Sequence, residues 1–288
     1  MKKTIITLIL ILFGLYILLS VFSIGDEYSA EKLLYRAAKV NEKIVSNPDV
    51  APPKMLAVVE STLKKVIEKY PTYNAAKMAY LALAEFYLSH KKYDAAISVL
   101  NTIISKPDKD ASLLSRAYFL KGNTYERQGQ WDKALKEYLF LRDNYIDTAL
   151  GLQMPMYITA YYIRKGQEGD ADKAFREAAA FYEKLGKDNQ GKVLGYKAST
   201  LLRDAYLGAK EYEKAGEVVK DIINNYFSQV ALVEQLPYVE PIYVNTLKTP
   251  GKAIEIYKSI IEKAKDKKLE ELLNKKIEAI KAGKPEKR

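Results

Sequence analysis

Apolar residues recur along most of the chain with the spacing of an α-helix. Ile97, Leu100, Ile103 and Ile104 show the pattern, because residues 103 and 104 would face opposite sides of a strand but share one stripe of a helix. No stretch alternates convincingly with the two-residue period of a half-buried strand. Prolines are expected mostly between the helices, at Pro48, Pro52, Pro53, Pro71, Pro107 and Pro155. The pattern predicts an all-α chain.

The first 25 residues have a different character, because residues 4–25 contain no charged side chain. As a helix, residues 5–24 would reach across the roughly 30 Å hydrocarbon core of a bilayer. Lys2 and Lys3 precede this segment, which places the N-terminus in the cytoplasm by the positive-inside rule. We therefore expect residues 1–25 to be a single-pass anchor in the inner (cytoplasmic) membrane, with the remaining chain in the periplasm.

A cleaved signal peptide is the alternative interpretation of the same segment. Its apolar core would be shorter, about 7–15 residues. Ser23 and Gly25 nevertheless place small residues where a peptidase cleaving before Asp26 needs them. Under this alternative the body is a soluble, secreted binding module.

The rest of the chain contains a sequence pattern that repeats with a longer period. Small residues recur every 38 to 41 residues, and most are preceded by aromatic residues three and nine positions earlier. An apolar residue follows seven positions after each one. The small residues are Ala96, Ala134, Ala174, Ala215 and Ala253.

The clearest copy contains Gly122, Tyr125, Gly129, Trp131 and Ala134 at a spacing that resembles the tetratricopeptide repeat (TPR), a pair of antiparallel helices. The resemblance covers about residues 28–265. It is strong in the windows around Ala96, Ala134 and Ala215, and weaker around Ala174, where Lys165 replaces the usual aromatic residue, and around Ala253.

The resemblance implies a right-handed superhelical solenoid of about six antiparallel helix pairs over residues 26–265, preceded by the transmembrane helix. Residues 266–288 are expected to form a capping helix and a basic tail. The apolar stripe of that helix consists of Leu269, Leu272, Leu273, Ile277 and Ile280.

Composition excludes several kinds of chemistry. The chain has no cysteine and one histidine, His90, which rules out thiolate sites and a multi-histidine metal site. Residues 186–193 nearly match a phosphate-binding loop, but they lack the Ser or Thr that binds magnesium and follow a helix. We expect no catalytic residue, no cofactor and no metal.

The chain is basic, with a net charge of +10. Residues 263–288 contain ten basic and five acidic side chains, so much of the excess is local to the C-terminal end. A local excess does not form the continuous basic stripe typical of nucleic-acid binding. We expect a solvated capping helix and no nucleic-acid partner.

In TPR arrays, the first helix of each pair lines a concave groove that binds peptides or partner helices. The resemblance thus implies a non-catalytic scaffold that binds a protein or peptide partner of the bacterial cell envelope. A less favoured alternative is a helical-superhelix hydrolase of cell-wall polymer. The residues expected to face the groove are Glu85, Arg116, Phe119, Asn123, Arg127, Lys197 and Asp204.

Overall fold

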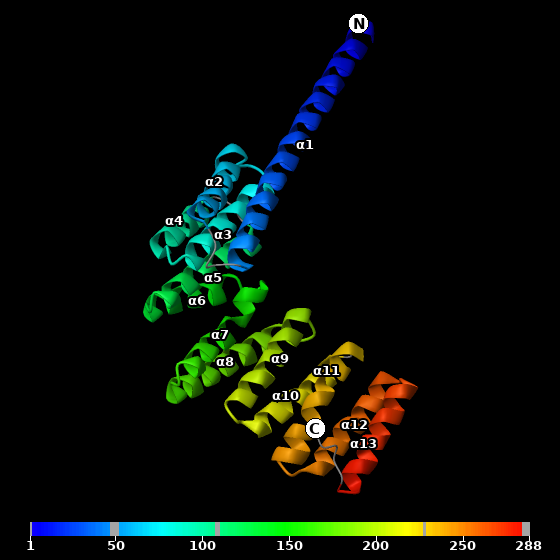
Figure 1. The fold of residues 1–288 in the computed structure, drawn as a ribbon. Helices are drawn as coiled ribbons and strands as arrows, with labels where there is room; N and C mark the ends of the chain where they lie inside the picture. Colours follow the sequence, from blue (N-terminus) through cyan, green and yellow to red (C-terminus); the bar gives the residue numbers. More distant parts are fainter. Residues whose placement is uncertain (1, 47–51, 107–109, 227–228, 284–288) are drawn as a thin grey trace. The chain divides into compact units, whose positions relative to one another are not determined.

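The computed structural model describes residues 2–46, 52–106, 110–226 and 229–283, although the side chains of residues 2–11, 15–24, 229 and 230 lie outside the description. Every regular element in those ranges is a helix (Figure 1), which confirms the all-α prediction. The chain divides into two compact units, Met1–Leu150 and Gly151–Arg288.

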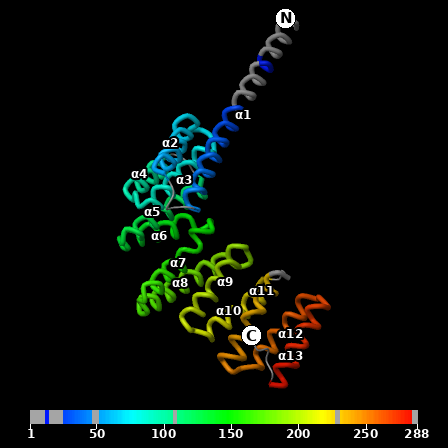
Figure 2. The backbone as a smooth tube through the Cα atoms, viewed as in Figure 1, coloured from blue at the N-terminus to red at the C-terminus, as the bar shows by residue number. Residues whose placement is uncertain are grey.

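Helices of the first unit pair in chain order, α1 with α2, α3 with α4 and α5 with α6, and the trace runs back and forth between them (Figure 2). Helix α3 also contacts both α1 and α5, so these three first helices form one layer. We call the surface of α1, α3 and α5 that faces away from α2, α4 and α6 the groove face. The helices are α1 (Lys2–Ser46), α2 (Pro53–Lys69), α3 (Asn74–Ser89), α4 (Tyr93–Ile104), α5 (Ala111–Arg127) and α6 (Trp131–Asn144).

A buried apolar stripe packs the second half of α1 against its neighbours. Ala30, Ala37 and Ile44 recur at intervals of seven along α1, and all three are buried in one core with Val59 and Leu63 of α2. A seven-residue interval keeps side chains on nearly the same face of a helix. The second half of α1 is thus held by apolar packing against α2 and α3.

Four turns between consecutive helices share one hydrogen-bond pattern. In each, a backbone N–H donates to the carbonyl of a tyrosine five residues earlier, at 2.8–3.0 Å. The residue before the donor adopts a left-handed conformation, with φ between 58° and 75°, as expected for a Schellman helix end. The pairs are Lys92 with Tyr87, Gln130 with Tyr125, Gln167 with Tyr162, and Glu211 with Tyr206.

This pattern corrects the alignment of one repeat. The N–H groups of Ala96, Ala134 and Ala215 each donate to the turn residue four positions earlier, and the corresponding group in the third window belongs to Ala171, which donates to Gln167. The repeat pattern in the sequence had aligned Ala174 at this position, three residues after the true equivalent. The turn tyrosine is Tyr162, so the apparent loss of the aromatic residue at Lys165 came from that shift.

The second unit contains α7, which begins at the last two residues of the first unit, and seven further described elements. Its core is formed by α10 to α13, with Val219, Ile242, Tyr257 and Leu273 almost fully buried. The elements are α7 (Ala149–Arg164), α8 (Glu168–Asp188), α9 (Val193–Gly208), α10 (Tyr212–Asn225), α11 (Gln229–Val239), the π-helix η2 (Glu240–Thr246), α12 (Pro250–Ala264) and α13 (Lys267–Lys281).

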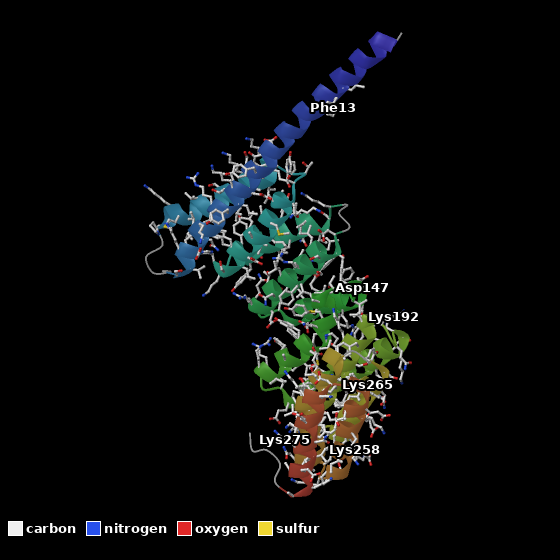
Figure 3. All side chains as sticks on the ribbon, turned by 90° about the vertical axis from the view of Figure 1, so that its right-hand side faces the viewer. Phe13, Asp147, Lys192, Lys258, Lys265 and Lys275 are labelled. Carbon is white, nitrogen blue, oxygen red and sulfur yellow. The ribbon has the colours of Figure 1, made fainter. Side chains whose placement is uncertain are left out.

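Two local expectations need correction in this unit. Pro155 lies inside α7 rather than between helices. Leu272 is 47% exposed, whereas the other members of the α13 stripe are buried. Helix α13 presents Leu269, Leu273, Ile277 and Ile280 to the core, and Leu272 lies off this stripe. Lys275 of α13 and Lys258 of α12 stand on exposed surface (Figure 3).

The predicted location in the inner membrane is wrong. In the parts of the chain that the structure describes, no helix combines the length and apolar character needed to cross a bilayer. The structure does not describe most of the side chains of residues 5–24. Two that it does describe, those of Leu12 and Phe13, belong to residues that are each 59% exposed (Figure 3). Helix α1 runs without a break from Lys2 to Ser46, so the apolar segment and the packed segment are parts of one helix.

Candidate functional site

The structure brings two of the predicted groove residues together on the groove face. Arg116 of α5 reaches across to Glu85 of α3, with Nη2 4.0 Å from Oε1. The same guanidinium donates through Nη1 to the sulfur of Met78 at 3.9 Å. Both charged side chains are about half exposed, so their attraction is screened and they remain available to a partner.

The other α5 candidates differ in their surroundings. Arg127 is exposed at the last residue of the helix, and Asn123 is half-buried one turn earlier. Phe119 is also half-buried, and its ring centroid lies 6.0 Å from that of Tyr138 in α6. Phe119 therefore contributes to packing within the α5–α6 pair, and Arg116, Asn123 and Arg127 supply the polar groups of this surface.

The remaining two candidates, Lys197 and Asp204, belong to α9 in the second unit. Lys197 is exposed. Asp204 accepts hydrogen bonds at 2.9 and 2.8 Å from Nε and Nη2 of Arg203, so its carboxylate is engaged within the chain.

Arg203 is the residue that sequence reasoning missed in this unit. The residue is 5% exposed. Its guanidinium donates through Nη1 to Oε1 of the fully buried Gln235 at 2.8 Å and lies 3.5 Å from the ring centroid of Tyr238. Buried cations are stable only when paired and hydrogen-bonded, and Asp204 with Gln235 meets this need. Asp204 is thereby a structural partner as well as a surface carboxylate.

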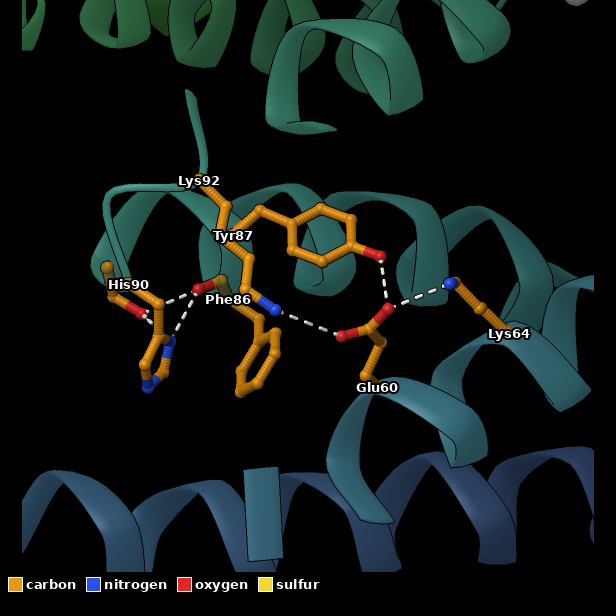
Figure 4. A network of polar contacts seen from close by, with 7 residues as sticks. Glu60, Lys64, Phe86, Tyr87, His90 and Lys92 are labelled. Atoms are coloured by element: carbon orange, nitrogen blue, oxygen red, sulfur yellow. Dashed lines mark hydrogen bonds and ion pairs between the residues drawn. The ribbon is translucent and has the colours of Figure 1, made fainter. Parts of the chain in front are cut away.

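A second polar network, in the first unit, joins α2 to α3 and to the turn after it (Figure 4). Oε1 of Glu60 accepts from Tyr87 Oη and from Lys64 Nζ, each at 2.8 Å, and Oε2 accepts from Lys92 Nζ at 3.4 Å. The hydrogen bonds from Lys64 and Tyr87 lower the pKa of Glu60 to about 2. The Glu60–Lys64 spacing of four residues was visible in the sequence, but the link to Tyr87 requires the fold.

His90 caps the end of α3 beside this network. Its Nδ1 lies 2.7 Å from the carbonyl oxygen of Phe86 and 3.0 Å from Ser89 Oγ, and its ring lies 4.4 Å from the Phe86 ring (Figure 4). The imidazole thus contributes to the end of α3. Among the described residues, no group of three or more acidic, histidine or cysteine side chains is placed to hold a metal ion.

Comparison with known proteins assigns the repeated part of the first unit. A family model described as a tetratricopeptide repeat-like domain matches residues 52–140. These residues include α2 to α6, the tyrosine-capped turns after α3 and α5, and the Glu85–Arg116 pair. No curated protein matches the chain.

Among solved structures, the chain is similar to the crystal structure of BtubC (BKLC) from P. vanneervenii. The two share 14% sequence identity over 91% of this chain and 94% of that one, with a TM-score of 0.31. A score this low supports no argument about arrangement or function. The family match confirms the resemblance drawn from the repeats: this chain carries a tetratricopeptide repeat-like domain over residues 52–140.

Proposed function

We propose that the protein is a non-catalytic scaffold that binds a peptide segment of a partner protein along the groove face of α1, α3 and α5. The observation that carries the proposal is the pairing of Glu85 with Arg116 across two adjacent first helices, with Asn123 and Arg127 farther along α5. Such a surface offers both charge signs and amide groups to an extended chain.

The geometry of α5 supports binding by several residues at once. Arg116, Asn123 and Arg127 are separated by seven and then four residues, so they project from nearly the same side of the helix. Arginine donates in a fork that suits carboxylates and backbone carbonyls. A peptide carboxylate would compete with Glu85 for Arg116 at little cost, since exposed ion pairs contribute only about 0–1 kcal/mol.

The experiment that tests this proposal is the double variant Arg116→Ala with Arg127→Ala in crosslinking and co-purification from intact cells. Loss of two charge-assisted contacts should weaken capture of the co-purified protein about tenfold or more. Helicity and melting temperature should stay nearly unchanged, because Arg116 and Arg127 are exposed.

Deletion of the chain after Ala282 is the control, because it removes basic charge and leaves the groove face intact. Retained capture after this deletion is expected. If the deletion abolishes capture and the double substitution has no effect, the partner binds the basic end and the proposal is wrong.

A further inference from the structure

A hollow of about 490 Å³ opens between α1, α2 and α3 of the first unit. Apolar side chains make up most of its wall, among them Leu34, Val45, Val59 and Leu63. Glu85 is also part of the lining, so the hollow opens beside the pair that it forms with Arg116. Its volume is within the range of about 300–1,000 Å³ that is usual for ligand pockets.

One polar atom in this wall lacks a partner. Oδ1 of Asn41 is shielded from solvent and accepts no hydrogen bond from any described residue. Buried acceptors are nearly always satisfied in folded proteins, because leaving one unpaired costs its lost hydration. Since solvent does not reach this oxygen, an occupant of the hollow does not reach it either, and the apolar wall and the charges at the rim determine what binds.

The charged side chains in the lining indicate the charge of the occupant. The charged side chains among its residues, Glu42 and Glu85, are both acidic, in a chain whose net charge is +10. Glu42 pairs with Lys39 at 2.7 Å, but both of these side chains are more than half exposed. Exposed pairs of this kind exchange partners readily. The hollow is therefore apolar inside and negative at its rim.

We propose that the hollow binds a large apolar side chain of a partner peptide, with a lysine or arginine next to it in the peptide held by Glu42 and Glu85. The inference rests on the proposed function and adds a direction to it: the basic residue of the peptide lies at α1 and α3, and an acidic residue or carboxylate lies at Arg116 and Arg127 of α5.

Selection of random twelve-residue peptides displayed on phage, with the full-length chain as bait, tests the proposal. Selected peptides should be enriched in Leu, Ile, Phe or Met directly next to Lys or Arg. The best peptide is then synthesised with a fluorophore, and its Kd for each variant is measured by anisotropy.

Ala38→Trp fills the hollow from an exposed position in its wall and should weaken binding about tenfold or more. Ala57→Trp, at an exposed alanine of α2 outside the lining, is the matched control and should leave Kd unchanged. The double variant Glu42→Lys with Glu85→Lys should reverse the selection, so that Asp or Glu replaces the basic residue beside the apolar one.

The results separate this inference from the function on which it rests. Unchanged binding to Ala38→Trp, together with loss of binding to the Arg116→Ala, Arg127→Ala variant, would show that the groove binds peptides and that the hollow does not. Concentration-dependent dimerisation abolished by Ala38→Trp would identify a second copy as the occupant and also overturn the inference. If no peptide is selected and no dimer forms, both proposals fail.

Discussion

Tyr87 of α3 donates a 2.8 Å hydrogen bond to the carboxylate of Glu60 in α2, across the contact between two successive helix pairs. Lys64 donates to the same oxygen from one turn along α2. Together they favour the charged form of Glu60, whose pKa falls from 4.5 to about 2. This carboxylate therefore links α2 of the first helix pair to α3 of the second in a way that depends on pH.

Acid should weaken the first unit through Glu60. In the unfolded chain Glu60 protonates near pH 4.5, but in the folded chain it stays ionised down to about pH 2, so the unfolded state binds more protons between these values. The stabilisation is complete above about pH 4.5 and is lost as the pH falls toward 2. Thermal melting of the full chain from pH 6 to pH 2.5 should show a declining melting temperature.

Glu60→Gln should flatten part of that decline and cost about 1.5–3 kcal/mol at neutral pH, the range for hydrogen bonds to charged groups. Glu68→Gln, at an exposed carboxylate of the same helix, is the matched control. Equal acid sensitivity in the wild-type chain and in Glu60→Gln would mean that this contact does not contribute to the decline.

Gly122 marks a point where α5 and α6 approach too closely for a side chain. A Cβ atom built there would lie 2.8 Å from Cδ1 of Tyr138, whose ring is fully buried. Gly122→Ala should therefore destabilise the chain by about 1–3 kcal/mol in urea unfolding. Gly169→Ala in α8 meets open space and should stabilise by about 0.5–1 kcal/mol. Equal effects would show that the close approach is absent.

Among the charged residues of α9, we expect substitution of Arg203 to lower the stability of the chain most. Arg203→Ala leaves the buried Gln235 without its donor and Asp204 without its cation, and the expected loss is about 3 kcal/mol. Lys197→Ala, at an exposed position of the same helix, should stay within about 0.5 kcal/mol of the parent. Similar unfolding midpoints for the two variants would contradict the burial of Arg203.

At the turn residues with a left-handed backbone, we expect a substitution to stabilise the chain. Lys91 has φ of 58°, which strains any residue with a Cβ atom, so Lys91→Gly should stabilise the chain by about 0.5–1 kcal/mol. Lys65→Gly, on the exposed surface of α2, should lose about 1 kcal/mol because glycine disfavours a helix interior. Differential scanning calorimetry of both variants checks the pair, and a destabilised Lys91→Gly variant would contradict the Schellman geometry.

The repeats could be predicted from the sequence because their signals are local. Tyr87, Tyr125 and Tyr206 stand at a fixed distance before each turn, and small residues follow where the next helix packs. The third repeat was misaligned because α8 is longer than its counterparts, so the period itself changes there. No single fixed interval aligns Ala171 with its equivalents.

The polar contacts could not be predicted because they join residues far apart in sequence. The burial of Arg203 depends on Gln235, 32 residues away, and nothing around Arg203 distinguishes it from a surface arginine. The unsatisfied oxygen of Asn41 likewise depends on packing between α1, α2 and α3. Glu85 and Arg116 were expected on one surface from the resemblance to the tetratricopeptide repeat and from helical spacing, but their contact needed the placement of α3 beside α5.

The central claim is that a partner binds the groove face of the first unit. A photo-crosslinking amino acid placed singly at Glu85 or Arg127 reports contacts on that face, and one placed at Lys136 or Lys65 reports contacts on the exposed surfaces of α6 and α2. After irradiation of intact cells, we predict a covalent adduct with one partner protein from positions 85 and 127 and none from positions 136 and 65. Adducts from positions 136 or 65 alone would contradict the account.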